Sequence, residues 1–76
     1  MSAPGLYRFR SETALGDSGL WHLEWEPVGS PGDRGRIERA LSKEVRDELK
    51  ANGILDPERV IAATELEAWI DQASWR

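Results

Sequence analysis

Two side chains in the sequence are of the kinds that bind a metal ion. His22 and Glu24 are two residues apart, and alternation along a β-strand would place both on the same face. Imidazole nitrogen and carboxylate oxygen are both common zinc ligands, but a zinc site has at least three protein ligands. The sequence indicates no third ligand beside this pair. We therefore predict no metal site and no cofactor, and we expect His22 to be solvated or paired with a glutamate.

Residues 16–19 contain a candidate nucleophile. Their sequence, Gly-Asp-Ser-Gly, matches the short stretch around the catalytic serine of chymotrypsin-like proteases. Such a serine needs a histidine base supplied by a separate part of a large scaffold, whereas the only histidine of this 76-residue chain is four residues from Ser18. The same four residues are typical of a turn. We predict no catalytic residues and expect the chain not to be an enzyme.

The region around this turn predicts a β-hairpin. Residues 6–10 alternate aromatic side chains with arginines, and residues 21–26 alternate large apolar side chains with polar ones. We expect opposite charges to face each other across the two strands, with Arg8 and Arg10 on the first and Glu24 and Glu26 on the second. The aromatic side chains would then lie together on the other face of the hairpin.

Residues 34–53 predict a central amphipathic helix. Its apolar side chains recur every four residues and form one stripe: Ile37, Leu41, Val45 and Leu49. Asp33 is the predicted N-cap. Asn52 and Gly53 predict its end, because glycine readily adopts the left-handed conformation that follows many helices. An isolated hairpin is marginal in water, so we expect its aromatic face to pack on this stripe.

The residues after Gly53 support two interpretations. Asp56 and Pro57 are typical of a helix start, which favours one helix over residues 57–75. Thr64 opens a capping-box pattern; in this alternative the helix begins there and residues 59–63 form a third strand. The predicted fold class is therefore α+β, with an N-terminal antiparallel hairpin packed on the central helix and a C-terminal helix after it.

Length and composition predict a single small domain. The chain contains no cysteine, so neither a disulfide nor a thiolate zinc cluster can stabilise it. We expect residues 1–5 to be flexible and residues 27–35, rich in glycine and proline, to form a flexible connection. No apolar run has the length of a membrane span and the N-terminus lacks an apolar signal segment, so we expect a cytoplasmic protein without membrane contact.

The charges are unevenly distributed along the chain. Residues 34–53 carry a net charge of +2, and the segments before and after them carry −3 each. On the predicted helix the cations step by three and four residues and form what we call the basic ridge: Arg36, Arg39, Lys43, Arg46 and Lys50. This ridge is a candidate contact surface, beside the simpler interpretation of a solvated helix face. The alternative contact surface is acidic: Glu24, Glu26, Glu58, Glu65, Glu67 and Asp71.

Without catalytic signatures, the sequence predicts a small protein-binding module that acts stoichiometrically on a larger protein or nucleoprotein complex. In size, acidity, lack of cysteine and hairpin-plus-helix pattern the chain resembles the phage-encoded anti-CRISPR proteins, which inhibit host defence. The resemblance rests on size and composition, not on a motif. It implies a Cas protein or complex as partner and blocked nucleic-acid binding as mechanism.

Two other functions stay open at this point. A nucleic-acid-binding regulator would use the basic ridge, although both acidic flanks would repel a phosphate backbone. A helix-turn-helix arrangement is also disfavoured, because the second helix carries few cations. An antitoxin or structural subunit would use the tryptophan-rich faces to complete an obligate assembly.

Overall fold

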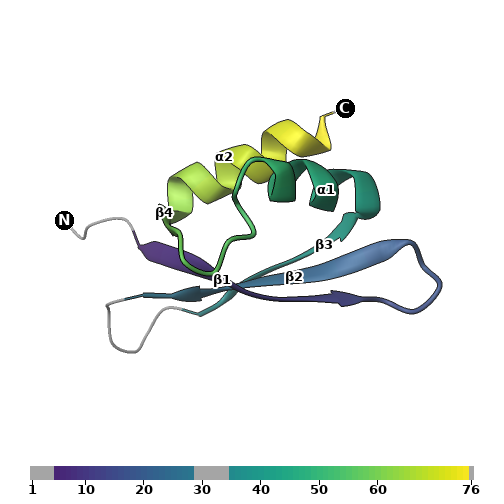
Figure 1. The fold of residues 1–76 in the computed structure, drawn as a ribbon, viewed down its shortest axis with the longest axis horizontal. Helices are drawn as coiled ribbons and strands as arrows, with labels where there is room; N and C mark the ends of the chain where they lie inside the picture. The colour runs from purple at the N-terminus through teal and green to yellow at the C-terminus, as the bar shows by residue number, and fades with distance from the viewer. Residues whose placement is uncertain (1–4, 29–34, 76) are drawn as a thin grey trace.

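The computed structural model describes residues 5–28 and 35–75, which form a four-stranded antiparallel sheet with two helices on one face (Figure 1). In chain order the elements are β1 (Leu6–Ala14), β2 (Leu20–Pro27), β3 (Ile37–Ser42), α1 (Lys43–Ala51), β4 (Val60–Ala62) and α2 (Ala63–Ser74). The strand order in the sheet is β3-β2-β1-β4, so β1 and β2 are central and β3 and β4 form the edges. The predicted α+β class is confirmed.

The predicted hairpin is formed by β1 and β2. Phe9 lies opposite Trp25 in the register, and their rings meet edge to face with centroids 5.8 Å apart. Gly16 and Gly19 in the connecting turn have φ values of 59° and 79°, which few other residues adopt. The Ser18 hydroxyl donates a hydrogen bond to the backbone carbonyl three residues earlier, at 2.7 Å. The Gly-Asp-Ser-Gly stretch is therefore a turn, as predicted.

The predicted helix over residues 34–53 is wrong in its first part. Residues 37–42 form strand β3, which pairs with β2, and α1 begins only at Lys43. The N-cap is Ser42, whose hydroxyl accepts a hydrogen bond from the backbone N–H of Val45 at 3.3 Å. The predicted N-cap, Asp33, lies outside the described residues. Residues 37–42 form a strand instead of a helix because the edge of β2 provides hydrogen-bond partners for their backbone groups.

The same pairing explains how the apolar side chains of this segment are covered. Ile37 lies opposite Trp25 and Leu41 lies opposite Trp21 in the β2–β3 register. Both β3 side chains pack against the core from the edge strand. The apolar stripe therefore continues from a strand into a helix, where Val45 and Leu49 extend it.

The predicted end of the central helix is confirmed. Asn52 is the C-cap of α1, and Gly53 after it has a φ of 76°. The backbone N–H of Ile54 donates to the carbonyl of Leu49 at 2.9 Å, and that of Gly53 donates to the carbonyl of Lys50 at 3.1 Å. This is the Schellman pattern of hydrogen bonds, accompanied by the expected burial of Ile54 and Leu49.

The C-terminal segment follows the alternative with a third strand near residues 59–63. Residues 60–62 form β4 beside β1, and α2 begins at Ala63, so the favoured single helix over residues 57–75 is wrong. The Asp56 side chain accepts a hydrogen bond from the backbone N–H of Glu58 at 2.9 Å, which closes a turn instead of starting a helix. Pairing with β1 holds residues 60–62 in an extended conformation, so the helix begins only at Ala63.

The core fills the space between the sheet and the two helices. Its buried side chains come from every element except β3: Tyr7, Phe9, Leu23, Trp25, Leu49, Ile54, Leu55, Ile61, Leu66, Ile70 and Ala73. The side chains that alternate with them on the strands point to the opposite side of the sheet. Both helices lie on the core side in Figure 1, and no described element covers the other side, which we call the free face.

Candidate functional site

The free face carries a connected set of ion pairs. Arg8 lies 2.9 Å from Glu26, and Arg10 contacts both Glu26 at 3.2 Å and Glu24 at 3.3 Å. The predicted match of two arginines with two glutamates across the hairpin is confirmed. Arg36, just before β3, adds a further contact to Glu24 at 3.1 Å. Hydrogen bonds from Arg8 and Arg10 lower the pKa of Glu26 below its ordinary value of 4.5.

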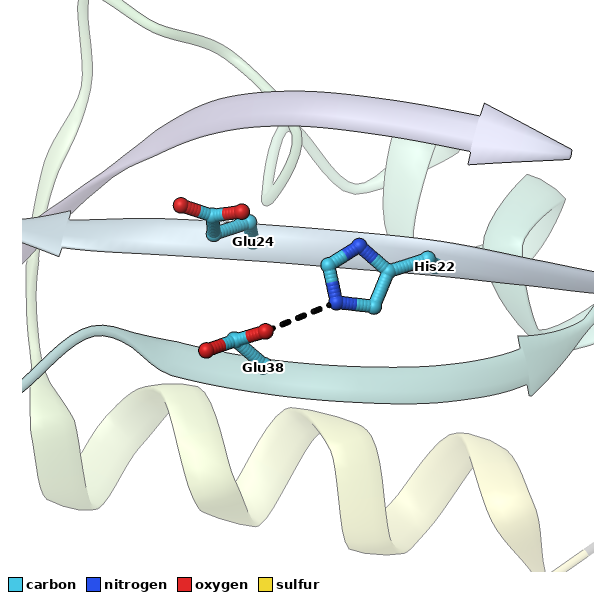
Figure 2. Close-up of side chains that lie close together, drawn as sticks. All are labelled: His22, Glu24 and Glu38. Carbon is cyan, nitrogen blue, oxygen red and sulfur yellow. Dashed lines mark hydrogen bonds and ion pairs between the residues drawn. The ribbon is translucent and has the colours of Figure 1, made fainter. Parts of the chain in front are cut away.

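Beside these ion pairs, three potential metal ligands lie together on the free face. Figure 2 shows His22 and Glu24 on β2 and Glu38 on the neighbouring strand β3. One ligand atom from each of the three lies within 4.8 Å of the other two. The Nε2 atom of His22 is 2.9 Å from a carboxylate oxygen of Glu38. The expected pairing of His22 with a glutamate is confirmed, although the partner is Glu38.

The strand register explains this cluster. Glu24 and Glu38 are directly opposite each other, and His22 is opposite Ala40, one pleat further along the same face. Two carboxylates directly across a strand pair repel each other. Arg36 brings a positive charge to Glu24, and the His22 ring contacts Glu38 through its Nε2 atom. The sheet therefore places two carboxylates next to each other, where a nearby positive charge reduces their repulsion.

Sequence reasoning missed Glu38 because residues 37–42 were assigned to a helix. The signal was present in the alternation of this segment, where Ile37, Arg39 and Leu41 take one face and Glu38, Ala40 and Ser42 the other. As a strand beside β2, this segment brings a third ligand next to the His22–Glu24 pair.

The basic ridge does not form a single surface. Its members lie on different elements and contact different acids: Arg36 pairs with Glu24, Arg39 with Glu67, Lys43 with Asp47, Arg46 with Glu12 and Asp47, and Lys50 with Glu12. The prediction of one ridge is wrong because it required one helix from residue 34 onward. Each of these cations is also balanced by a nearby carboxylate.

Arg46 is the most enclosed of these cations. Its side chain is 14% exposed, and it lies 2.7 Å from Glu12 and 2.9 Å from Asp47. Its guanidinium carbon is 4.2 Å from the centre of the Trp21 ring, a favourable cation–π distance. The hydrogen bond with Glu12 raises the pKa of Arg46 above its ordinary value. Arg46 therefore fastens α1 to the sheet instead of presenting a charge to a partner.

The acidic alternative is also divided between two sides of the molecule. Glu24 and Glu26 lie on the free face, whereas Glu65, Glu67 and Asp71 belong to α2 on the helical side. Glu65 pairs with Arg59 at 3.4 Å, and Glu67 makes a two-oxygen contact with Arg39 at 2.8 Å. Within the described part of the chain, Glu58 and Asp71 are exposed and make no ion pair. The six acids therefore cannot contact one flat partner surface together.

Comparisons of the chain with protein-family models, with curated proteins and with solved structures found no match. Among residues 5–28 and 35–75, neither helix has the length and apolar character needed to cross a membrane.

Proposed function

We propose that the chain is a protein-binding module that uses the free face of its sheet as its contact surface. The observation that carries this proposal is the connected set of ion pairs on this uncovered face, formed by Arg8, Arg10, Glu24, Glu26 and Arg36. A surface of alternating, mutually held charges favours a partner with the complementary pattern and disfavours others, because a misplaced like charge costs free energy.

The ion pairs also reduce the cost of binding. Long side chains lose conformational entropy when a partner immobilises them. Arg10 is already held between Glu24 and Glu26, so part of this entropy is lost on folding. The face is thereby prepared for contact, although ion pairs of this kind contribute more to specificity than to affinity.

An apolar corner of the same face supplies a candidate anchor. Val60 on β4 lies opposite Arg8, and Leu6 is two residues before Arg8 on β1, so the two apolar side chains are near neighbours on the free face. Each residue is 48% exposed. Burial of such side chains in a partner releases about 1.5–3 kcal/mol per fully buried side chain. We expect this corner to supply affinity and the ion pairs to supply selection.

The resemblance to anti-CRISPR proteins indicates which partner to test first. On this proposal the partner is a nucleic-acid-binding complex such as a Cas complex, and the free face covers a surface that the nucleic acid needs. Direct nucleic-acid binding receives less support, because each cation of the basic ridge already faces a carboxylate.

The test is an affinity capture with matched variants as bait, in lysate of the organism that encodes the chain or, for a phage protein, of its host. Val60→Asp places a charge in the apolar corner. Trp75→Asp makes the same kind of change on an 80% exposed side chain after α2, on the helical side. We expect the wild type and Trp75→Asp to capture one partner chain at near-stoichiometric yield. We expect Val60→Asp not to capture it.

Circular dichroism and thermal melting should show that both bait variants are folded. Loss of the partner with Trp75→Asp and its retention with Val60→Asp would move the contact surface to the helices and contradict the proposal. Recovery of nucleic acid alone, removed by nuclease or by salt, would contradict it in favour of a regulator.

A further inference from the structure

We propose that His22, Glu24 and Glu38 form a binding site for a divalent metal ion, with Zn²⁺ as the ion that fits best. The three ligand atoms lie within 4.8 Å of one another on two adjacent strands (Figure 2). Bound zinc holds its nitrogen and oxygen ligands at about 2.0–2.2 Å. Small rotations of side chains on the sheet surface bring the three atoms to such distances from a shared ion. This proposal does not depend on the proposed protein-binding function.

The ligand set favours zinc over the common alkaline-earth ions. One imidazole and two carboxylates form a mixed nitrogen and oxygen donor set, which zinc and similar transition metals accept. Calcium and magnesium prefer oxygen donors throughout. His22 is the only histidine in the chain and cysteine is absent, so no other group of described residues combines an imidazole or thiolate with carboxylates.

The electrostatics of the strand pair support a cation at this position. Glu24 and Glu38 are directly opposite each other, and an ion bound by both carboxylates would offset their mutual repulsion. The Glu24 side chain is only 12% exposed, and its Oε2 atom is inaccessible to solvent and accepts no hydrogen bond within the described chain. Enclosed carboxylate oxygens normally have such a partner, and a metal ion would provide one.

Two arginines compete with the ion for this oxygen. Arg36 and Arg10 lie 3.1 Å and 3.3 Å from Oε2 of Glu24, without the alignment of a hydrogen bond. Their side chains are 51% and 46% exposed, so either can turn toward water when an ion binds. The ion would also replace the contact between His22 and Glu38. We therefore expect binding that is specific but weaker than in a zinc site built from cysteine thiolates.

The first test is isothermal titration of ZnCl₂ into the full chain without a purification tag, because a polyhistidine tag binds zinc itself. We expect one ion per chain, with the affinity reduced at least about 10-fold in His22→Ala and in Glu38→Gln, since even residues behind the ligands change metal affinity by that factor. The matched control is Glu67→Gln, which removes a similarly exposed carboxylate on α2. It should bind zinc like the wild type.

Nuclear magnetic resonance locates the ion independently of affinity. The single imidazole has one pair of ring proton signals, which should shift on addition of one equivalent of Zn²⁺, while MgCl₂ at the same concentration leaves them unchanged. His22 and Glu38 are partly exposed, so their variants should give the dispersed amide spectrum of the folded chain. Absence of zinc binding at millimolar concentration overturns the proposal, as does binding that leaves the His22 signals and both variants unaffected.

Discussion

The indole nitrogen of Trp25 donates a hydrogen bond to the backbone carbonyl oxygen of Ile54 across 3.2 Å. This contact joins the central strand β2 to the turn that ends α1. Trp25 is completely buried and also packs edge to face on Phe9. One side chain thus connects the hairpin, the helix end and the core between them.

We predict that Trp25→Ala removes a large share of the free energy of unfolding. Replacing a buried tryptophan by alanine costs about 3–5 kcal/mol. A domain of this length has a free energy of unfolding of roughly 4–11 kcal/mol. Urea denaturation followed by circular dichroism measures the difference. Trp75→Ala is the control, because Trp75 is 80% exposed and its loss should change the free energy of unfolding by less than about 0.5 kcal/mol. Equal stability of the two variants would contradict the central role of Trp25.

Arg46→Glu should destabilise the protein, in contrast to the expectation for a surface contact on a basic ridge. The change reverses a charge that faces Glu12 and Asp47 and removes the cation from the Trp21 ring. We expect the melting temperature to fall by at least about 5 °C. Arg36→Glu, at a half-exposed position, should lower it by much less. Differential scanning calorimetry of both variants measures the two melting temperatures. Equal decreases would show that Arg46 is an ordinary surface residue and does not hold α1 to the sheet.

Two carboxylates make stability depend on acid pH. Arg8 and Arg10 lower the pKa of Glu26 from 4.5, and Lys43 and Arg46 lower the pKa of Asp47 from 3.8. A carboxylate whose pKa is lowered by folding stabilises the folded state. This stabilisation is complete at a pH above the ordinary pKa, and it is lost as the pH falls through the lowered pKa of the folded state. The melting temperature should therefore decrease as the pH falls below about 4.5.

The variant Glu26→Gln isolates one of these groups. Its melting temperature should approach that of the wild type as the pH falls from 6 to 2, because the wild type loses the charge that the variant lacks. Asp71→Asn serves as the control, since Asp71 is exposed and makes no ion pair with the residues that the structure describes. A constant difference between Glu26→Gln and the wild type across this range would show that Glu26 contributes no pH-dependent stability.

The error over residues 37–42 has a simple geometric cause. Ile37, Leu41, Val45 and Leu49 are spaced by four residues. Four is close to one helical turn, and it is also an even number, so the spacing places side chains on one face of a helix and equally on one face of a strand. The spacing alone cannot distinguish the two. The open edge of β2 beside this segment is what selects the strand.

Only part of the candidate metal site could be predicted from the sequence. His22 and Glu24 are near each other in sequence, and their common face follows from strand alternation. Glu38 is fourteen residues beyond Glu24, and its position depends on which strand pairs with β2 and in which register. A shift of that register by one residue would turn Glu38 to the core side.

The sequence by itself determined the features that depend on neighbouring residues: the hairpin with its matched charges, the turn at Gly16 and Gly19, and the end of α1 at Asn52 and Gly53. Local backbone preferences and side-chain alternation are sufficient for these. Only the tertiary structure decided that residues 37–42 and 60–62 become edge strands, because their local patterns also fit a helix and the pairing with β2 or β1 selects the strand. Those two pairings also disperse the basic ridge and bring Glu38 to His22.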